Sequence, residues 1–194
     1  MKKNKFTLWD ERYEKGQHWE SKKTSKDIKD FEKYLKKRTK ILDLGCGSGR
    51  DAIYLAKKGF EVYGIDVSKV ALERARKKYG GKNLHLIVGE AENLPFKNNF
   101  FDAIYCGWVL HFTKLEKSTS EIIRVLKKGG VVYLGFLLNM KFIETGKIEN
   151  IIEKGKTMPY FKKLKIIKEK EYEVTDADEE RPHKHDISVV VLKK

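Results

Sequence analysis

The amino-acid sequence predicts an α/β protein with a doubly wound, mostly parallel seven-stranded sheet, a C-terminal antiparallel hairpin and helices on both faces. Three observations predict this fold class. Between residues 40 and 138, short apolar runs alternate with segments of helical periodicity, as in parallel strands joined by helices. The first apolar run leads into a loop with three glycines. The last two apolar runs, residues 163–174 and 187–192, have no helix between them, which is typical of a hairpin.

The first predicted helix spans residues 25–37, where apolar residues at helical spacing precede a basic end. We expect this helix to pack on the sheet. The other predicted helices span residues 50–58, 68–79 and 115–127, with Ser68 as an N-cap. The strands that precede the hairpin are predicted at residues 40–44, 61–65, 84–88, 101–106 and 131–137.

The glycine loop follows the first strand as Gly45-Cys46-Gly47-Ser48-Gly49. A chain that leaves a buried strand and enters a helix within a few residues needs positive φ angles, and its backbone must let a ligand approach. Glycine meets both needs at the least cost. Asp66 ends the second strand about twenty residues later, where doubly wound folds place a carboxylate against ribose hydroxyls. Together these features predict a nucleoside pocket.

The spacing of the loop separates two kinds of adenosine cofactor. Dinucleotide-binding loops have the pattern G-x-G-x-x-G and bind a pyrophosphate at the first helical turn. Here Arg50 stands at the position of the last glycine, and Asp43 lies two residues before the first. A carboxylate that faces the loop repels a pyrophosphate but suits an ammonium or sulfonium group. The sequence therefore predicts a ligand in which adenosine is joined to a cationic amino acid.

Four motifs in correct order, from about residue 40 to residue 138, resemble those of the class I S-adenosylmethionine-dependent methyltransferases. The first two are Asp43-Leu44-Gly45-Cys46-Gly47-Ser48-Gly49 and Gly64-Ile65-Asp66-Val67-Ser68. The third is Gly89-Glu90-Ala91-Glu92-Asn93-Leu94-Pro95-Phe96, followed by Phe100-Phe101-Asp102-Ala103-Ile104-Tyr105. The fourth is Val125-Leu126-Lys127-Lys128-Gly129-Gly130. The chain is most similar in character to the thiopurine, tellurite-resistance and ubiquinone-biosynthesis methyltransferases, which act on small molecules. The resemblance also supplies the strand order.

The resemblance implies S-adenosyl-L-methionine as the cofactor and S-adenosyl-L-homocysteine as its product. The cofactor-binding residues that it implies are Asp43, Gly45, Cys46, Gly47, Asp66, Val67, Glu90 and Ala91. In the family an acidic residue and an alanine after the third strand hold the adenine amino group, although Asp is commoner there than Glu90. The alternative for Glu90 is a solvated loop acid. Asp102, at the entry of a buried strand, is interpreted as a structural residue that caps or pairs locally.

Length and composition fit one domain over residues 1–194, with a core of ample size and no repeat or low-complexity tract. Residues 1–38 are predicted to form an N-terminal helical lid and cap. Residues 39–138 are predicted to form the cofactor-binding core. Residues 139–194 are predicted to supply a C-terminal helix and the closing hairpin.

The acceptor site is expected beyond the carboxyl ends of the strands. The segment from Trp9 to Trp19 resembles the lid of small-molecule methyltransferases, and its aromatic rings are candidates to cover cofactor and acceptor. Tyr13 and Trp19 are therefore assigned to the substrate pocket. The alternative is an amphipathic cap on the sheet.

The stretch after the fourth strand is Gly107-Trp108-Val109-Leu110-His111-Phe112. In related enzymes it runs beneath the methionine end of the cofactor, so the resemblance makes Trp108 a pocket residue and His111 a candidate base or orienting group. The alternative for His111 is a buried structural histidine. His183 and His185 point to one side if extended and are assigned to a polar pocket wall. No third ligand is secured by spacing, so no metal site is predicted.

The net charge of +14 commonly marks a partner that carries phosphates. Most of the 42 basic residues are lysines, however, and they alternate with glutamates along nearly every predicted helix. Nucleic-acid readers favour clustered arginines. A nucleic-acid partner is therefore the less favoured interpretation, and a small-molecule acceptor is the predicted partner.

The two cysteines and the start of the chain, which has no apolar stretch after its basic residues, predict a cytoplasmic protein. The longest apolar run, residues 131–138, is too short to span a bilayer, so no membrane partner is predicted. Cys46 and Cys106 are interpreted as small buried residues. Cys106 also lacks the preceding proline of a pyrimidine-methylating nucleophile. The oligomeric state stays open.

The sequence thus predicts an S-adenosylmethionine-dependent methyltransferase that transfers a methyl group to a small molecule by in-line displacement. One alternative is an RNA or protein methyltransferase of the same fold. Against it, Cys106-Gly107-Trp108-Val109 stands where such enzymes carry an Asn-Pro-Pro-Tyr type tetrapeptide. The other alternative is a noncatalytic sensor or scaffold that binds S-adenosylmethionine. The acceptor and its reacting atom stay open.

Overall fold

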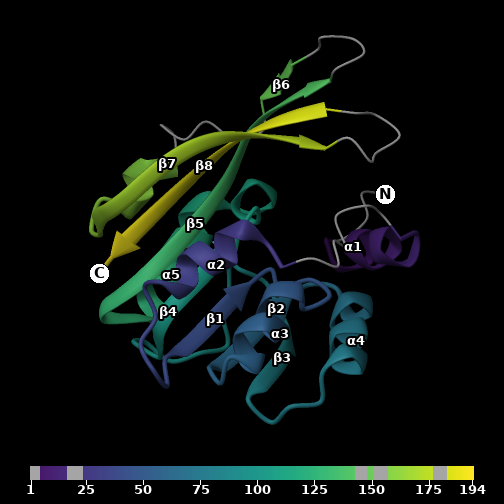
Figure 1. Ribbon diagram of the computed structural model, residues 1–194, viewed down its shortest axis with the longest axis vertical. Coiled ribbons are helices and arrows are strands. Elements are labelled where there is room, and N and C mark those ends of the chain that lie inside the picture. The colour runs from purple at the N-terminus through teal and green to yellow at the C-terminus, as the bar shows by residue number, and fades with distance from the viewer. Residues whose placement is uncertain (1–4, 17–23, 143–147, 151–156, 177–182) are drawn as a thin grey trace.

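The computed structural model describes residues 5–16, 24–142, 148–150, 157–176 and 183–194. Its sheet has seven strands along one path, in the order β3-β2-β1-β4-β5-β8-β7, and a short strand β6 that pairs with β5 (Figure 1). The strands are β1 Lys40–Leu44, β2 Glu61–Asp66, β3 Leu84–Val88, β4 Phe101–Gly107, β5 Leu126–Phe142, β6 Ile148–Asn150, β7 Lys165–Asp176 and β8 His183–Lys193.

Strands β1 to β5 pair in parallel, and β8 pairs antiparallel with both β5 and β7. The predicted doubly wound, mostly parallel sheet with an antiparallel C-terminal pair is therefore confirmed. Because the parallel strands β1, β4 and β2 lie side by side, their carboxyl ends meet at one edge. The candidate site lies along this edge.

Helices cover both faces of the sheet, as predicted. On one face α2 Lys26–Glu32, α3 Arg50–Lys57 and α4 Lys69–Lys78 contribute to a core that includes Phe31, Leu55 and Leu72. On the other face α5 Leu115–Val125 and the short 3-10 helices η1 Leu110–Phe112 and η2 Met158–Phe161 contribute to a second core. The sheet separates these two apolar cores, so each strand that is central in the sheet is buried on both sides.

Two local predictions about polar residues are confirmed. Ser68 is the N-cap of α4, and its side chain accepts a hydrogen bond from the Ala71 amide. Asp102 is structural, since its carboxylate accepts from the Lys40 amide at 2.9 Å and from Lys127 Nζ at 2.6 Å. Asp102 therefore ties the start of β1 to β4 and β5.

The structure differs from several of the predicted element bounds, and strands β7 and β8 each extend beyond the predicted C-terminal end, with β8 beginning at His183 rather than at residue 187. The first helix ends at Glu32 rather than at residue 37. The last long helix ends at Val125, because Leu126 already pairs with Phe101 across the sheet. Strand β5 has 17 residues, whereas the sequence predicts seven, because β8 pairs with it from Val131 to Phe142. In the last two cases, long-range strand pairing overrides the local pattern.

The C-terminal helix expected within residues 139–194 stays a prediction, because residues 143–147, 151–156 and 177–182 lie outside the described residues. In the described parts of that region, β5 continues to Phe142, β6 adds to its edge, and η2 supplies four helical residues. The distal parts of β5, β7 and β8, together with β6, form a twisted extension that we call the arm. In Figure 1 the arm rises above the edge where the parallel strands end.

The N-terminal helix α1 Lys5–Glu14 packs against α4 (Figure 1). It therefore lies at the same edge of the sheet as the glycine loop. Trp19, the other predicted lid aromatic, falls outside the described residues. No helix in the described parts of the chain has the length and apolar character needed to cross a membrane.

Candidate cofactor and acceptor site

The glycine loop joins β1 to α3 and takes the backbone shape that its sequence predicts. Gly45, Gly47 and Gly49 have φ angles of 73°, 52° and 79°. The amides of Gly45 and Cys46 both donate to the Ile65 carbonyl, at 2.8 and 3.1 Å, so the loop is held against the end of β2. A Cβ at Gly45 would lie 2.2 Å from Val109 Cγ2. Both the positive φ and the lack of space for a Cβ therefore require glycine at position 45.

Asp66, at the end of β2, holds the same loop with its carboxylate. Its Oδ2 accepts from the Gly47 amide at 2.8 Å, and its Oδ1 accepts from the Ser68 amide at 2.9 Å. Burial raises the pKa of Asp66, and the amide hydrogen bonds oppose that rise. Each oxygen keeps a second lone pair, which is what binding of ribose hydroxyls requires.

Asp43 is the most unusual group at the loop. Only 3% of the residue is exposed, and its Oδ2 has no hydrogen-bond partner among the described residues. Burial raises the pKa of this carboxyl group well above its ordinary value, Asp51 adds to the rise, and Arg50 opposes it. A buried acceptor without a partner is costly. It fits a ligand that brings a cationic donor, such as the ammonium group of S-adenosylmethionine.

Glu90 and Ala91 lie beside Asp66, because the Gly89 amide donates to the Asp66 carbonyl at 2.9 Å. Ala91 is buried, and Glu90 is half-buried with its backbone paired to Asn93. Val67 follows Asp66 directly and is also half-buried. The structure thus gathers these predicted cofactor residues at the ends of β2 and β3. We call them, with Asp43 and the glycine loop, the donor site.

Cys46 contributes to the donor site through its backbone. Its side chain is turned toward β2, since a Cβ at Gly64 would lie 2.8 Å from Cys46 Sγ. Burial raises the pKa of Cys46 and that of Cys106, so both thiols stay protonated. Both cysteines are buried and free. This environment agrees with the interpretation of both as small buried residues.

The chain after Glu90 is held in place by an ion pair on α5 that the sequence analysis did not single out. Glu121 Oε2 accepts from the Leu94 amide at 2.7 Å. Arg124 donates to the carbonyls of Leu94 and Phe96, at 3.0 and 2.6 Å, and pairs with Glu121. The i, i+3 spacing of Glu121 and Arg124 is visible in the sequence and indicates a pair. Its backbone partners are visible only in the fold.

Helix α1 covers the glycine loop with Tyr13. Tyr13 is buried, and a Cβ at Gly47 would lie 2.4 Å from its hydroxyl oxygen. Arg74 on α4 donates to the Tyr13 carbonyl at 2.7 Å. Asp10 accepts from Ser68 Oγ at 2.6 Å and from the Val70 amide at 3.1 Å, which adds a second cap to α4. The sequence gives no signal for the Asp10 contact.

Trp9, which is also on α1, contacts the 3-10 helix η1. Its ring meets Phe112 edge-on with centroids 5.0 Å apart, so α1 reaches from α4 to η1. The rings of His111 and Phe112 lie 4.0 Å apart. We call Trp9, Trp108, His111 and Phe112 the acceptor site. The fold brings these residues, together with Tyr13, to the carboxyl ends of β1 and β4.

His111 lies in η1 and is half-buried. Burial lowers its pKa to about 4, so the imidazole is uncharged at neutral pH. A base of this strength removes few protons at pH 7, because general bases work best with a pKa near the operating pH. The neutral ring can still accept or donate a hydrogen bond.

The two C-terminal histidines lie on the arm. His185 is buried and pairs with Met140, four residues before Val189, which pairs with Gly135. At about 3.4 Å per residue it is therefore roughly 14 Å along β8 from the level of Trp108. The side chain of His183 falls outside the description. Within the described residues, no three His, Cys, Asp or Glu side chains are arranged to hold a metal ion.

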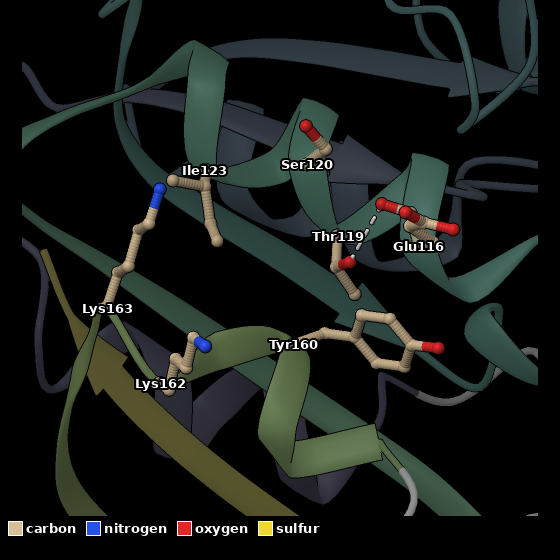
Figure 2. A pocket seen from close by; sticks show the side chains of 7 residues that line it. All are labelled: Glu116, Thr119, Ser120, Ile123, Tyr160, Lys162 and Lys163. Carbon is tan, nitrogen blue, oxygen red and sulfur yellow. Dashed lines mark hydrogen bonds between the residues drawn. The ribbon is translucent and has the colours of Figure 1, made fainter.

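An open pocket lies away from the donor site, between α5 and η2 (Figure 2). Its lining residues are Glu116, Thr119, Ser120, Ile123, Tyr160, Lys162 and Lys163. The Thr119 hydroxyl is already bonded to the backbone of α5. None of the predicted cofactor or substrate residues lines this pocket, so it plays no part in the site.

The chain was compared with known proteins. Residues 42–134 match the family described as a methyltransferase domain. A curated relative, the uncharacterized methyltransferase YodH of Bacillus subtilis, is 37% identical over 94 residues, which are 47% of this chain and 40% of the relative. A demethylmenaquinone methyltransferase of Symbiobacterium thermophilum is 37% identical over 99 residues, 46% of this chain and 39% of the relative. The matched part therefore spans about two fifths of these curated relatives.

Solved structures match over a longer stretch and show the fold. One, described as a TehB-like SAM-dependent methyltransferase from Corynebacterium glutamicum, has a TM-score of 0.67 and 20% identity, and 97% of each chain is covered. Another, from work on the conversion of a disulfide bond into a thioacetal group during echinomycin biosynthesis, has a TM-score of 0.79 and 18% identity, over 97% of this chain and 92% of the other. The methyltransferase resemblance inferred from the motifs is confirmed for the matched domain, and the solved structures share its fold. Residues 42–134, just under half of the chain, match the methyltransferase-domain family, and the sheet that contains them has the fold of solved methyltransferase structures.

Proposed function

We propose that this protein is an S-adenosylmethionine-dependent methyltransferase that acts on a small-molecule acceptor. The observation that carries the proposal is the buried Asp43 carboxylate, whose Oδ2 lacks a partner beside a loop of positive-φ glycines. A nucleoside site without an attached cation does not need this charge. A ligand with an ammonium and a sulfonium group satisfies it.

Each of the donor-site residues is proposed to bind a different part of the cofactor. Asp43 binds the ammonium group, Asp66 binds the ribose hydroxyls, and Glu90 with Ala91 borders the adenine. When bound, the cofactor supplies an electrophilic methyl group that a nucleophilic acceptor atom takes by in-line displacement, which leaves S-adenosylhomocysteine as a neutral thioether. The protein's own task is to align the acceptor and to exclude water.

Two observations support a small acceptor. Helix α1 crosses the edge of the sheet from α4 to Phe112 and places Tyr13 on the glycine loop, which restricts access to the donor site. Several relatives are named as quinone methyltransferases, among them a demethylmenaquinone methyltransferase and a ubiquinone/menaquinone biosynthesis C-methyltransferase. His111 is proposed to orient the acceptor through a hydrogen bond rather than to remove its proton, because burial lowers its pKa to about 4.

Cofactor binding is tested first, by calorimetry with S-adenosylhomocysteine on the wild type and on Asp66→Ala. We expect a dissociation constant in the micromolar range and a loss of about tenfold or more in the variant, since it removes hydroxyl partners and the Gly47 contact. Lys69→Ala, at an exposed position three residues further along the chain, is the matched control. Unchanged affinity in Asp66→Ala would refute the donor-site assignment.

Acceptor class is tested by methyl transfer from labelled S-adenosylmethionine to a metabolite extract and, separately, to total RNA and to protein. Label in low-molecular-weight products is the expected result. Label in RNA or protein alone would replace the small-molecule proposal with a macromolecular one. Tight cofactor binding with no labelled product in any pool would indicate a noncatalytic sensor.

A further inference from the structure

Trp108 has a backbone conformation that a bulky residue rarely adopts. Its φ is 63°, in the left-handed region. Such strain costs on the order of 1–3 kcal/mol and persists where the surroundings enforce it, most often at functional sites. Here the surroundings are strand ends, because the Trp108 amide donates to the Gly135 carbonyl at 2.9 Å.

The indole of Trp108 lies against the backbone of β5. A Cβ at Gly135 would come within 3.0 Å of Trp108 Cδ1 and 3.2 Å of its Nε1, so the glycine makes room for the ring. The residue is nevertheless 40% exposed. A strained residue thus holds an aromatic surface at the carboxyl end of β4, supported on one side by β5 and open to solvent elsewhere.

A second aromatic surface stands four residues further along the chain. Phe112 is 46% exposed, meets Trp9 of α1 edge-on at 5.0 Å, and lies 4.0 Å from the His111 ring. The rings come from β4, η1 and α1, which converge at the edge that carries the donor site. Exposed aromatic rings that gather at one edge, rather than singly, are typical of a ligand-binding site.

The same stretch carries no formal charge. Residues 107–112 include no carboxylate, ammonium or guanidinium group, and the one titratable side chain, His111, is uncharged at neutral pH. The buried Asp43 and the half-buried Asp66 belong to the donor site. The Arg12 guanidinium lies 4.9 Å from the centroid of the Trp9 ring and already makes a cation–π contact there. A charged acceptor would therefore lose its hydration without gaining a partner within residues 107–112.

We propose that the acceptor is a planar, uncharged aromatic compound that stacks on Trp108, with Trp9 and Phe112 closing the site around it. This inference rests on the proposed methyltransferase function and adds the substrate class. Pockets that recognise such compounds combine aromatic walls with one or two orienting polar groups. The neutral His111 supplies one such group, through a hydrogen bond to a hydroxyl or carbonyl on the ring.

The test is a binding measurement that needs no methyl transfer. The full chain is saturated with S-adenosylhomocysteine and titrated by calorimetry with three probes: 2-naphthol, its saturated analogue decahydro-2-naphthol, and naphthalene-2-carboxylate. We expect 2-naphthol to bind about tenfold tighter than either of the others, since only it is both planar and uncharged.

Two variants assign the preference to Trp108. Trp108→Gly accepts the positive φ without strain, so it is expected to fold, to bind S-adenosylhomocysteine as the wild type does, and to lose about five- to tenfold in 2-naphthol affinity. Trp108→Phe keeps an aromatic face and is expected to stay within about threefold of the wild type.

Equal affinities for the three probes, or no binding of 2-naphthol, would overturn the aromatic-acceptor inference. So would an unchanged 2-naphthol affinity in Trp108→Gly. Failure of the underlying function would look different, because S-adenosylhomocysteine itself would then not bind in the saturation step.

Discussion

Two carboxyl groups meet at the donor site, and their hydrogen bonds differ. Both oxygens of Asp66 accept from backbone amides, at 2.8 and 2.9 Å, so this group holds the loop even without ligand. Asp43 leaves one buried oxygen without a partner. An unsatisfied buried group costs about 1–3 kcal/mol. The free protein therefore carries a local cost at Asp43 that a cationic ligand removes, while Asp66 acts first as a structural residue.

The pKa of His111 gives a pH test at the residue scale. Folding lowers its pKa from the ordinary 6.5 to about 4, so between these values the unfolded chain binds more protons than the native protein. The stability from this residue is full above pH 6.5 and is lost as the pH falls toward 4. His111→Gln should therefore lose less stability between pH 8 and pH 5, by on the order of 1–2 kcal/mol.

Urea unfolding of both proteins at the two pH values measures this difference. Other groups titrate in the same way in wild type and variant, so the comparison isolates residue 111. Equal losses in both proteins would show that His111 protonates in the native state as freely as in the unfolded one.

At the scale of elements, the sequence predicted those features that depend on residues close together in the chain. The glycine spacing, Asp66 at the end of β2 and the Ser68 cap were all found where the sequence placed them. The contact of Asp10 with Ser68 joins residues 58 positions apart and follows no periodicity, so the docking of α1 on α4 was not predictable. The length of β5 also escaped prediction, because pairing with β8 decides it.

The docking of α1 gives a prediction at this scale. Asp10→Ala removes both acceptor contacts to the start of α4, so α1 should spend more time away from the glycine loop. We expect faster amide hydrogen exchange in residues 5–14 and several-fold weaker binding of S-adenosylhomocysteine, since Tyr13 then covers Gly47 less.

Hydrogen exchange followed by mass spectrometry measures the first effect and calorimetry the second. Glu14→Ala, at an exposed position of the same helix, is the control and should resemble the wild type. Unchanged exchange in Asp10→Ala would mean that the hydrogen bonds of Asp10 do not hold α1.

At the scale of the whole molecule, helix α2 joins the C-terminal hairpin to the core through two buried carboxylates, Asp27 and Asp30. Asp27 on α2 is 4% exposed and accepts from the hydroxyls of Tyr133 and Tyr172, at 3.0 and 2.6 Å. Lys170 pairs with the same carboxylate at 3.5 Å. Helix α2 thus bonds to β5 and β7 across 106 and 145 positions of the chain.

Loss of this junction should affect the stability of the whole domain. Asp27→Ala leaves two tyrosine hydroxyls without their acceptor, while Lys170 keeps its pair with Asp30 at 3.2 Å, and we expect the variant to lower the free energy of unfolding by about 2–4 kcal/mol. Lys26→Ala, at an exposed neighbouring position, should change it by less than about 0.5 kcal/mol. Urea denaturation measures both. A small effect of Asp27→Ala would show that the hydrogen bonds of Asp27 do not hold the hairpin on the core.

The hydroxyl of Ser68 has a consequence for the reaction cycle. It donates to Asp10 of α1, while its own amide donates to Asp66 of the donor site. In the proposed function, S-adenosylhomocysteine therefore lies behind α1, which is hydrogen-bonded to the turn that follows Asp66. Exchange of the product for new cofactor requires the hydrogen bond between Ser68 and Asp10 to break. We therefore expect release of S-adenosylhomocysteine, rather than methyl transfer, to limit the steady-state rate.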